Sequence, residues 1–257
     1  MQRLVSLLML ALLPLICVAQ KRVEVWTYHV SPPFIIDETH GLSRALVTLL
    51  NDDPRNGGRL HFDLRPLPRK RVDQRLADDR PGVLLWATPR FLSAEQAGRA
   101  RWSPPLLRDQ QDFVSLPDMP FEYEGPTSLR GMQLGGVLGH HYPDLDAEIA
   151  SGAIRRQDVR SDLQNLQKLL SGRIHTLLIP RSTLLYYRKE RKLGDLYVSA
   201  VPLYQFTRHL LITDTLGKAA AEYLEDFVAT LPDNPEWQIL LFRYGLEPIA
   251  SEPTTPR

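Results

Sequence analysis

Residues 23–34 read VEVWTYHVSPPF, and residues 41–51 read GLSRALVTLLN. The β-branched and aromatic run 23–28 predicts a buried strand. The second segment predicts a helix, because its apolar side chains recur at helical spacing: Leu42, Ala45, Leu46, Leu49 and Leu50. A strand, a proline-containing turn and an amphipathic helix in this order indicate a βα unit at the start of the folded chain.

The same alternation continues to residue 245. Further strands are expected at 60–67, 83–87, 133–138 and 174–179, and further helices at 69–77, from Ser161, at 216–231 and from Asn234 to Gly245. Ser161 and Gln164 have the spacing of a capping box, and Gly172 suits the position just after a helix. Alternating strands and helices predict an α/β fold with mainly parallel sheets.

Composition excludes several classes of protein. The 257 residues are 43% hydrophobic and 24% charged, which is far from disordered, collagen-like or multispan membrane sequences. Lysine and arginine total 31 against 30 acidic residues, so no net field favours nucleic acid as a partner. The length suggests one large domain or two small ones.

Residues 1–19 predict a signal peptide. Arg3 precedes an apolar stretch that ends in the small residue Ala19, which is a plausible cleavage point before Gln20. A membrane anchor is less consistent with the sequence because Pro14 interrupts a stretch that is already short. A lipid anchor on Cys17 is disfavoured by Ile16 before it. The mature protein would then be periplasmic, with a loose tail at 248–257.

Several short motifs resemble one family in the order expected of it. After the opening stretch these are Trp102-Ser103-Pro104-Pro105, Ser128-Leu129-Arg130-Gly131, Leu169 to Ile174 and Val201-Pro202-Leu203. Together they resemble the bacterial extracellular solute-binding proteins of family 3, which are best known for binding polar amino acids. The resemblance implies a two-lobed type II periplasmic-binding-protein-like α/β fold with two interlobe crossings. Lobe 1 would comprise 20–116 and 202–247, and lobe 2 would comprise 117–201.

The resemblance also implies a function. The protein would close by hinge motion around a small-molecule ligand and deliver it to the permease of an ABC transporter, acting as a monomer. A ligand-sensing partner of a membrane receptor needs the same hinged cleft, so the sequence leaves both roles open. A dehydratase-like enzyme on the same fold is a third reading, with His140, His141 and Glu95 as the available acids and bases.

Three positions depart from the family pattern. Gln96 stands where the resemblance implies an arginine for a ligand carboxylate. Pro180 stands where it implies an aspartate for a ligand ammonium, and His175 replaces a second aspartate. A free α-amino acid is therefore not the expected ligand.

Other residues could supply the binding site. Arg90 and Arg181 follow strands whose ends are expected to face the cleft, one from each lobe, and two guanidinium groups would favour an anionic ligand. The alternative is that both are solvated loop arginines. Backbone N–H groups at the helix start formed by Gly139, His140, His141 and Tyr142 would add to an anion site. The expected walls are Tyr28, Phe34, Trp86 and Thr88, although Trp86 could equally belong to the core.

No cofactor is expected. The histidines at 140, 141 and 175 have neither tight helical spacing nor an acidic partner, so a metal site is disfavoured. The basic run that contains Arg65, Arg69, Lys70 and Arg71 is interspersed with aspartates, which indicates a solvated face.

Overall fold

The computed structural model describes residues 20–191 and 193–247. The expected signal peptide at 1–19 and the expected tail at 248–257 lie outside the described residues. No helix in the described ranges is long and apolar enough to cross a membrane.

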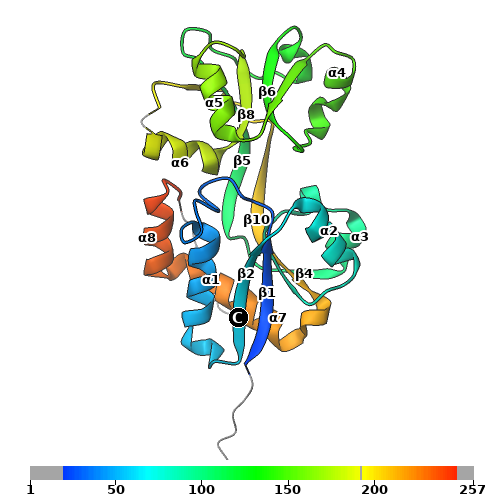
Figure 1. The fold of residues 1–257 in the computed structure, drawn as a ribbon, viewed down its shortest axis with the longest axis vertical. Coiled ribbons are helices and arrows are strands. Elements are labelled where there is room, and N and C mark those ends of the chain that lie inside the picture. Colours follow the sequence, from blue (N-terminus) through cyan, green and yellow to red (C-terminus); the bar gives the residue numbers. More distant parts are fainter. Residues whose placement is uncertain (1–19, 192, 248–257) are drawn as a thin grey trace, which may run out of the picture.

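Two lobes are stacked along the long axis of the molecule, and two strands run between them (Figure 1). The first lobe contains the strands β1 (Lys21–Thr27), β2 (Leu60–Pro66), β3 (Gly82–Ala87) and β4 (Ala100–Trp102). Its helices are α1 (Leu42–Asp52), α2 (Arg69–Ala77), α3 (Ala94–Gly98), α7 (Lys218–Thr230) and α8 (Pro235–Arg243). The second lobe contains β6 (Gln133–Val137), β7 (Arg155–Val159) and β8 (Thr176–Pro180), with α4 (Asp146–Ala150), α5 (Asp162–Leu170) and α6 (Arg181–Arg191).

The strands that cross between the lobes are β5 (Leu107–Ser115) and β10 (Tyr204–Thr213). They pair with each other in antiparallel register, Leu107–Gln111 against Tyr204–Arg208. The strand order is β2-β1-β3-β10-β5-β8-β6-β7, and β9 (Tyr197–Val198) pairs with β5. Within the lobes β1 is parallel to β2 and β3, and β6 is parallel to β7 and β8. The α/β class and the two crossings are therefore confirmed.

Each lobe has its own hydrophobic core. In the first lobe, Leu42, Leu46 and Leu50 of α1 are fully buried against the sheet, as their spacing predicts. In the second lobe, Leu166 and Leu169 of α5 pack with Val114, Leu177 and Ile179. Both helices are stable in place because a continuous apolar stripe is removed from water.

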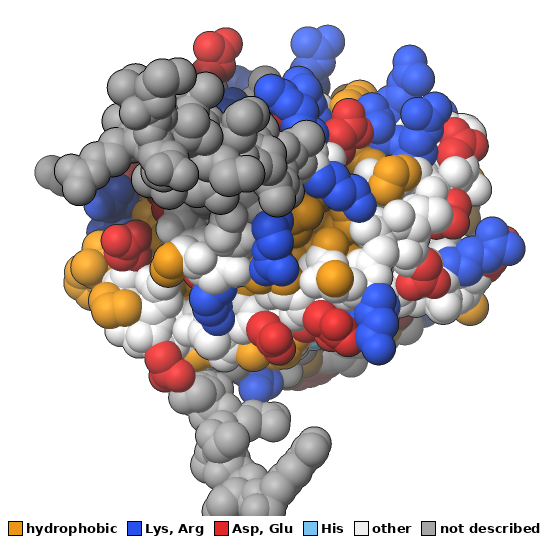
Figure 2. Space-filling view, turned by 90° about the horizontal axis from the view of Figure 1, so that it is seen from below, with side chains coloured by type: hydrophobic (Ala, Val, Ile, Leu, Met, Phe, Trp, Pro, Cys, Tyr) orange, Lys and Arg blue, Asp and Glu red, His pale blue; other side chains and the backbone are white. Residues whose placement is uncertain are grey.

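Helix ends follow the expected chemistry with one difference. Ser161 Oγ accepts the N–H of Gln164 at 3.3 Å, but the Gln164 side chain accepts the N–H of Arg160 instead of completing the capping box. Asn234 caps α8 by accepting the N–H of Trp237 at 3.0 Å. At the far end of the first lobe, acidic and basic side chains are interspersed over the face seen in Figure 2.

Candidate ligand-binding site between the lobes

The two crossing strands form a ribbon with two distinct faces, because side chains alternate along a strand. One face, here the front face, carries Asp109, Tyr204, Phe206 and Arg208, with the rings of Tyr204 and Phe206 5.8 Å apart. The other, the back face, carries Gln110 and Asp112, whose side chains are joined by a 2.6 Å hydrogen bond. The face to which a residue belongs decides whether it can reach a ligand held in front of the ribbon.

Arg208 lies at the centre of the front face. Its Nε donates to Asp109 Oδ2 at 2.8 Å, and the two side chains are 2% and 1% exposed. The guanidinium lies 4.6 Å from the ring centroid of Phe34 and 4.9 Å from that of Phe206. Asp109 also accepts the backbone N–H and the hydroxyl of Ser182 at the start of α6. This ion pair therefore connects both crossing strands with a residue of each lobe.

The loop after β1 contributes from the first lobe. His29 lies against Phe34, and both of its ring nitrogens are 3.4 Å from Arg208 Nη1. Burial, together with the positive charge of Arg208, holds the pKa of His29 well below its usual value, so the ring is neutral. The guanidinium of Arg69, on α2, lies 4.9 Å from the ring of Tyr28. Arg69 is thus part of this wall and not simply a member of a solvated basic run.

The second lobe contributes His140 after β6 and Asp162 after β7. Ser31 Oγ, in the loop after β1, donates to Asp162 Oδ2 at 2.8 Å and so joins the two lobes. Burial raises the pKa of Asp162, whereas the nearby His140 ring opposes that rise. His140 is exposed to solvent on one side, but the protein around its ring partly desolvates it and lowers its pKa, and Asp162 opposes that shift in turn. These two groups face the loop of the first lobe that carries His29 and Ser31.

Arg90 makes the second polar contact between the lobes. Its Nη2 donates to Asp144 Oδ2 at 2.6 Å, and its guanidinium stacks 4.3 Å from the ring of Tyr204 on the front face. Arg90 therefore lies between the lobes, as the sequence predicts, but a carboxylate of the protein neutralises it. The pair is about 40% exposed on each side, so it lies at the rim and not in the interior.

Arg181 lies elsewhere, and the predicted pairing with Arg90 across a ligand is wrong. Its Nε and Nη2 bind the two oxygens of Asp112, at 2.7 and 3.1 Å, on the back face of the ribbon. Helix α6 follows β8 without an intervening loop, so Ser182 turns to Asp109 while Arg181 points to the opposite face. The two arginines thus lie over opposite faces of the crossing ribbon.

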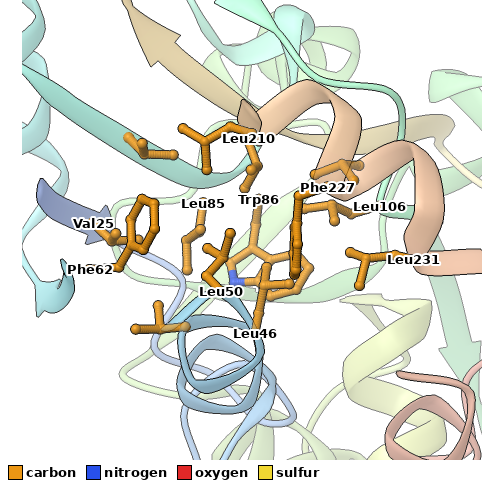
Figure 3. Close-up of a cluster of buried hydrophobic side chains, with 14 of the residues drawn as sticks. Val25, Leu46, Leu50, Phe62, Leu85, Trp86, Leu106, Leu210, Phe227 and Leu231 are labelled. Atoms are coloured by element: carbon orange, nitrogen blue, oxygen red, sulfur yellow. The ribbon is translucent and has the colours of Figure 1, made fainter. Parts of the chain in front are cut away.

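Two of the four residues predicted to line the pocket, and the loop predicted to bind an anion, are also placed differently from the prediction. Trp86 is fully buried in the core of the first lobe beside Phe34, where its Nε1 donates to Ser43 Oγ at 2.8 Å (Figure 3). Its φ of 62° rotates the ring out of the strand alternation and into the core. Thr88 is 2% exposed. The helix start after Gly139, His140, His141 and Tyr142 carries Asp144 and Asp146, so acidic side chains already occupy its positive end.

Phe34 and Tyr142 are almost completely buried, at 2% and 1% exposure, although the ring of Phe34 still contacts Arg208. Gly139 and His141 are exposed. Among the described residues, no group of three or more His, Cys, Asp or Glu side chains could hold a metal ion. His175 precedes β8, where its Nδ1 accepts the N–H of Gln133, at the opposite end of β6 from His140.

The position of Gln96 has a structural role. Ser93 and Gln96 form a complete capping box at the start of α3, with both hydrogen bonds at 3.1 Å. A cavity of about 460 Å³ lies beside it within the first lobe, lined by Arg69, Asp73, Glu95, Gln96 and Arg99. Four of the charges that line it form the pairs Arg69–Asp73 and Arg99–Glu95, and the carboxylate of Asp79 also lies in the lining. Glu95 is therefore bound within α3 and remote from the histidines of the second lobe.

Sequence reasoning missed His29, Ser31, Asp109, Asp162 and Arg208. The sequence predicts a helix from Ser161 but no role for Asp162 beside it, and it does not predict the crossing strands that carry Asp109 and Arg208. One signal was present: Asp109 lies in a polar run, 108–112, between the apolar pairs Leu106-Leu107 and Phe113-Val114, and Arg208 and His209 directly precede the apolar run 210–212. Charged residues within strands that must be buried are expected to be paired.

No protein-family model matches the sequence, and no curated protein matches it either. Solved structures do match. The substrate-binding protein of an ABC uptake transporter from Streptococcus pneumoniae, with bound histidine, has a TM-score of 0.68 at 15% identity, covering 90% of this chain and 95% of that one. The GluR0 ligand-binding core from Nostoc punctiforme, in complex with L-glutamate, has a TM-score of 0.67 at 14% identity, covering 86% and 98%.

A third similar structure is the ancestral amino-acid-binding protein AncCDT-1, a precursor of cyclohexadienyl dehydratase. Its TM-score is 0.64 at 13% identity, and the match covers 87% of this chain and 95% of that one. At such identities the likeness concerns the fold alone. The chain has the two-lobed type II periplasmic-binding-protein fold, with its polar residues gathered where such a fold closes.

Proposed function

From this fold, we propose that the protein is a periplasmic solute-binding protein that closes its two lobes around a small polar ligand. One observation carries the proposal: ionisable and hydroxyl side chains from both lobes and from the crossing strands converge in front of the ribbon. His29 and Ser31 come from the first lobe, His140 and Asp162 from the second, and Arg208 from a crossing strand. Polar groups are costly to bury unless they form hydrogen bonds, and a ligand between the lobes can supply these.

The mechanism follows from the contacts between the lobes. In the closed arrangement Ser31 binds Asp162 and Arg90 binds Asp144, so each closing contact joins one lobe to the other. A ligand that touches both lobes stabilises this arrangement over an open one by its additional contacts. The crossing strands, which belong to both lobes, would act as the hinge.

The ligand is not expected to be a free α-amino acid. Gln96 is engaged in a capping box and Pro180 carries no charge, so neither can bind an α-carboxylate or an α-ammonium group as an ion. The two arginines, Arg90 and Arg181, no longer support an anionic ligand. Each is bound to an aspartate of the protein, and the two arginines lie over opposite faces of the crossing ribbon. A small polar ligand without both zwitterionic groups remains the proposal.

Export and partners complete the proposed role. We propose that residues 1–19 are removed as a signal peptide and that the mature protein works as a monomer with the permease of an ABC transporter or with a membrane sensor. Intact-mass measurement of secreted protein should give a chain that starts near Gln20. A protein retained in the membrane with its first residues intact would contradict the localisation.

The experiment that tests binding is a thermal-shift screen of small polar solutes, followed by small-angle X-ray scattering with the best of them. At least one solute should raise the melting temperature by several degrees and narrow the distribution of molecular dimensions toward the closed form. The twenty standard amino acids belong in the same screen, and we expect none of them to bind below 1 µM, an affinity of about −8 kcal/mol. A library without any stabilising solute would contradict the proposal.

A further inference from the structure

One edge of the second lobe holds an unusual set of polar atoms. The carboxyl ends of the parallel strands β6, β7 and β8 meet there, and such an edge is where open α/β sheets bind ligands. Each strand is followed by a residue with a buried polar atom that has no hydrogen-bond partner among the described residues: Tyr142 OH, Asp162 Oδ1 and Thr183 Oγ1. The three residues are 1%, 2% and 0% exposed.

These atoms belong to one neighbourhood. The carboxyl of Asp162 acts electrostatically on the hydroxyl of Tyr142 and on that of Tyr187, and burial with this charge raises the pKa of Tyr187 to about 12. Thr183 lies four residues before Tyr187 on α6, and residues at this spacing share one helix face. The Asp162 carboxylate is therefore close enough to Tyr142 and Tyr187 to act on both hydroxyls, and its Oδ1 is unpaired among the described residues.

Asp162 also differs from the other acidic groups at the junction of the lobes. Asp109 is paired with Arg208, Asp144 with Arg90 and Asp158 with Arg156. Within the described part of the chain, Asp162 forms no ion pair; its one side-chain hydrogen bond is to Ser31. The pKa values of the nearby histidines, His29 and His140, are both lowered, because the surrounding protein desolvates their rings. A guanidinium does lie close by, because Arg156 stacks 4.9 Å from the ring of Tyr142, but its partner is Asp158, so no described residue gives Asp162 a counter-charge of its own.

We propose that Asp162, at the sheet edge that also carries the unpaired hydroxyls of Tyr142 and Thr183, binds the ammonium or other cationic donor group of a small organic ligand between the lobes. The inference rests on the proposed solute-binding function. A cationic group would supply the missing counter-charge and donate hydrogen bonds to Oδ1 and to the hydroxyl oxygens. Ser31 binds the other carboxylate oxygen, so closure of the lobes completes the coordination of this group.

The test is calorimetric titration of the mature protein with ethanolamine, putrescine and agmatine as cations, and with succinate and inorganic phosphate as anions. We expect at least one of the cations to bind, and the affinity to fall at least tenfold in Asp162→Asn, which keeps the shape but removes the charge. Tyr142→Phe and Thr183→Val should each weaken binding severalfold. The control Asp195→Asn, an exposed carboxylate of the same lobe, should bind like the wild type.

Tyr142→Phe and Thr183→Val keep the test valid if Asp162→Asn does not fold, because each of them removes one hydroxyl and no charge. Failure of all three cations to bind the wild-type protein at 10 mM would overturn the inference. Equal affinity of the wild-type protein and Asp162→Asn for a cation that binds would also overturn the inference. If succinate, phosphate or an uncharged solute from the thermal screen binds and closes the lobes, the solute-binding function stands and only the cationic ligand class is wrong.

Discussion

At the scale of single residues, the buried ion pair of Arg208 and Asp109 dominates the junction of the lobes. Both side chains are almost inaccessible, and the guanidinium lies against two aromatic rings. Removal of water from two charges is costly, and the pair is stable only because each charge and its hydrogen-bonding groups are satisfied. The pair is thus a position where a single substitution has a large effect.

We expect Arg208→Met to lower the free energy of unfolding by about 3–5 kcal/mol, because it leaves the Asp109 carboxylate buried without a cation. The double variant Arg208→Met with Asp109→Asn should recover a large part of that loss, since no charge then remains buried. Urea denaturation of the three proteins measures both effects. A loss below about 1 kcal/mol in the single variant would show that the pair is hydrated in solution.

His29 predicts a pH dependence of stability. Its pKa is lowered in the folded protein, so in the unfolded chain it binds a proton more readily, at its usual value of about 6.5. The stability it contributes is present above that pH and is lost as the pH falls through 6.5 toward the folded value. His140 acts in the same direction and Asp162 in the opposite one, so the comparison must isolate His29.

The variant His29→Gln cannot be protonated. Between pH 8 and pH 5 the free energy of unfolding should fall more steeply in the wild-type protein than in this variant. Denaturant titrations at four or five pH values give the two curves. Parallel curves would mean that His29 has the same pKa in both states.

At the scale of elements, the amino-acid sequence predicts most of the regular structure of the first lobe but only β6, α5 and β8 of the second, and it predicts neither crossing strand. The helices at 42–52, 69–77 and 162–170 agree with their apolar spacing, and the strands β1, β2, β3, β6 and β8 agree with their β-branched or apolar runs. Helix α6 was missed because it begins at Arg181 directly after β8, where a loop was expected to follow the strand. That omission also misplaced Arg181, because a residue at a helix start points differently from one in an extended loop.

The candidate site could be predicted only in part, since it depends on contacts between distant segments. Tyr28 and Arg90 could be located from their positions after strands. The hydrogen bond from Ser31 to Asp162 joins residues 131 positions apart, and Asp109 and Arg208 are 99 positions apart. Local patterns can indicate that a buried charge needs a partner, but they do not say which distant residue supplies it. Gln96 was recognised as a departure from the family, but its use in a helix cap depends on Ser93 and the local backbone.

Helix α8 offers a test of capping at the element scale. Asn234→Ala should lower the free energy of unfolding by about 1 kcal/mol, because the N–H of Trp237 loses its acceptor. Asn234→Gly is the matched control and should cost only a few tenths of a kcal/mol, because glycine suits the same backbone position and leaves the N–H open to water. Urea denaturation distinguishes the two variants. Equal losses would assign the effect to something other than the cap.

At the scale of the whole molecule, the lobes are held together by contacts of modest strength. The pair of Arg90 and Asp144 is partly exposed, and pairs of this kind contribute at most about 1 kcal/mol. Interlobe contacts that contribute less free energy than ligand binding are suited to a protein that must open again. The free energy that separates open and closed forms is expected to be small enough for a single solute to shift it.

We therefore expect Asp144→Asn to favour open conformations by up to about fivefold, as 1 kcal/mol allows. A pair of fluorophores, one in each lobe, would report the change as lower energy transfer in the absence of solute. Arg130→Gln is the control, because its ion pair with Glu148 lies entirely within the second lobe. The same shift in both variants would contradict a role for Asp144 in closure.

The position of β10 in the sheet has a consequence for the order in which the chain folds. This strand pairs with β3, β4 and β5, yet it is made more than 80 residues after the last of them. The second lobe is continuous from β6 to α6, so its contacts can form before the segment that follows α6 takes part. The first lobe must wait until β10, α7 and α8 join it, and closing so long a loop slows its assembly. The last described segment of the chain is thus the one that completes the core of the first lobe.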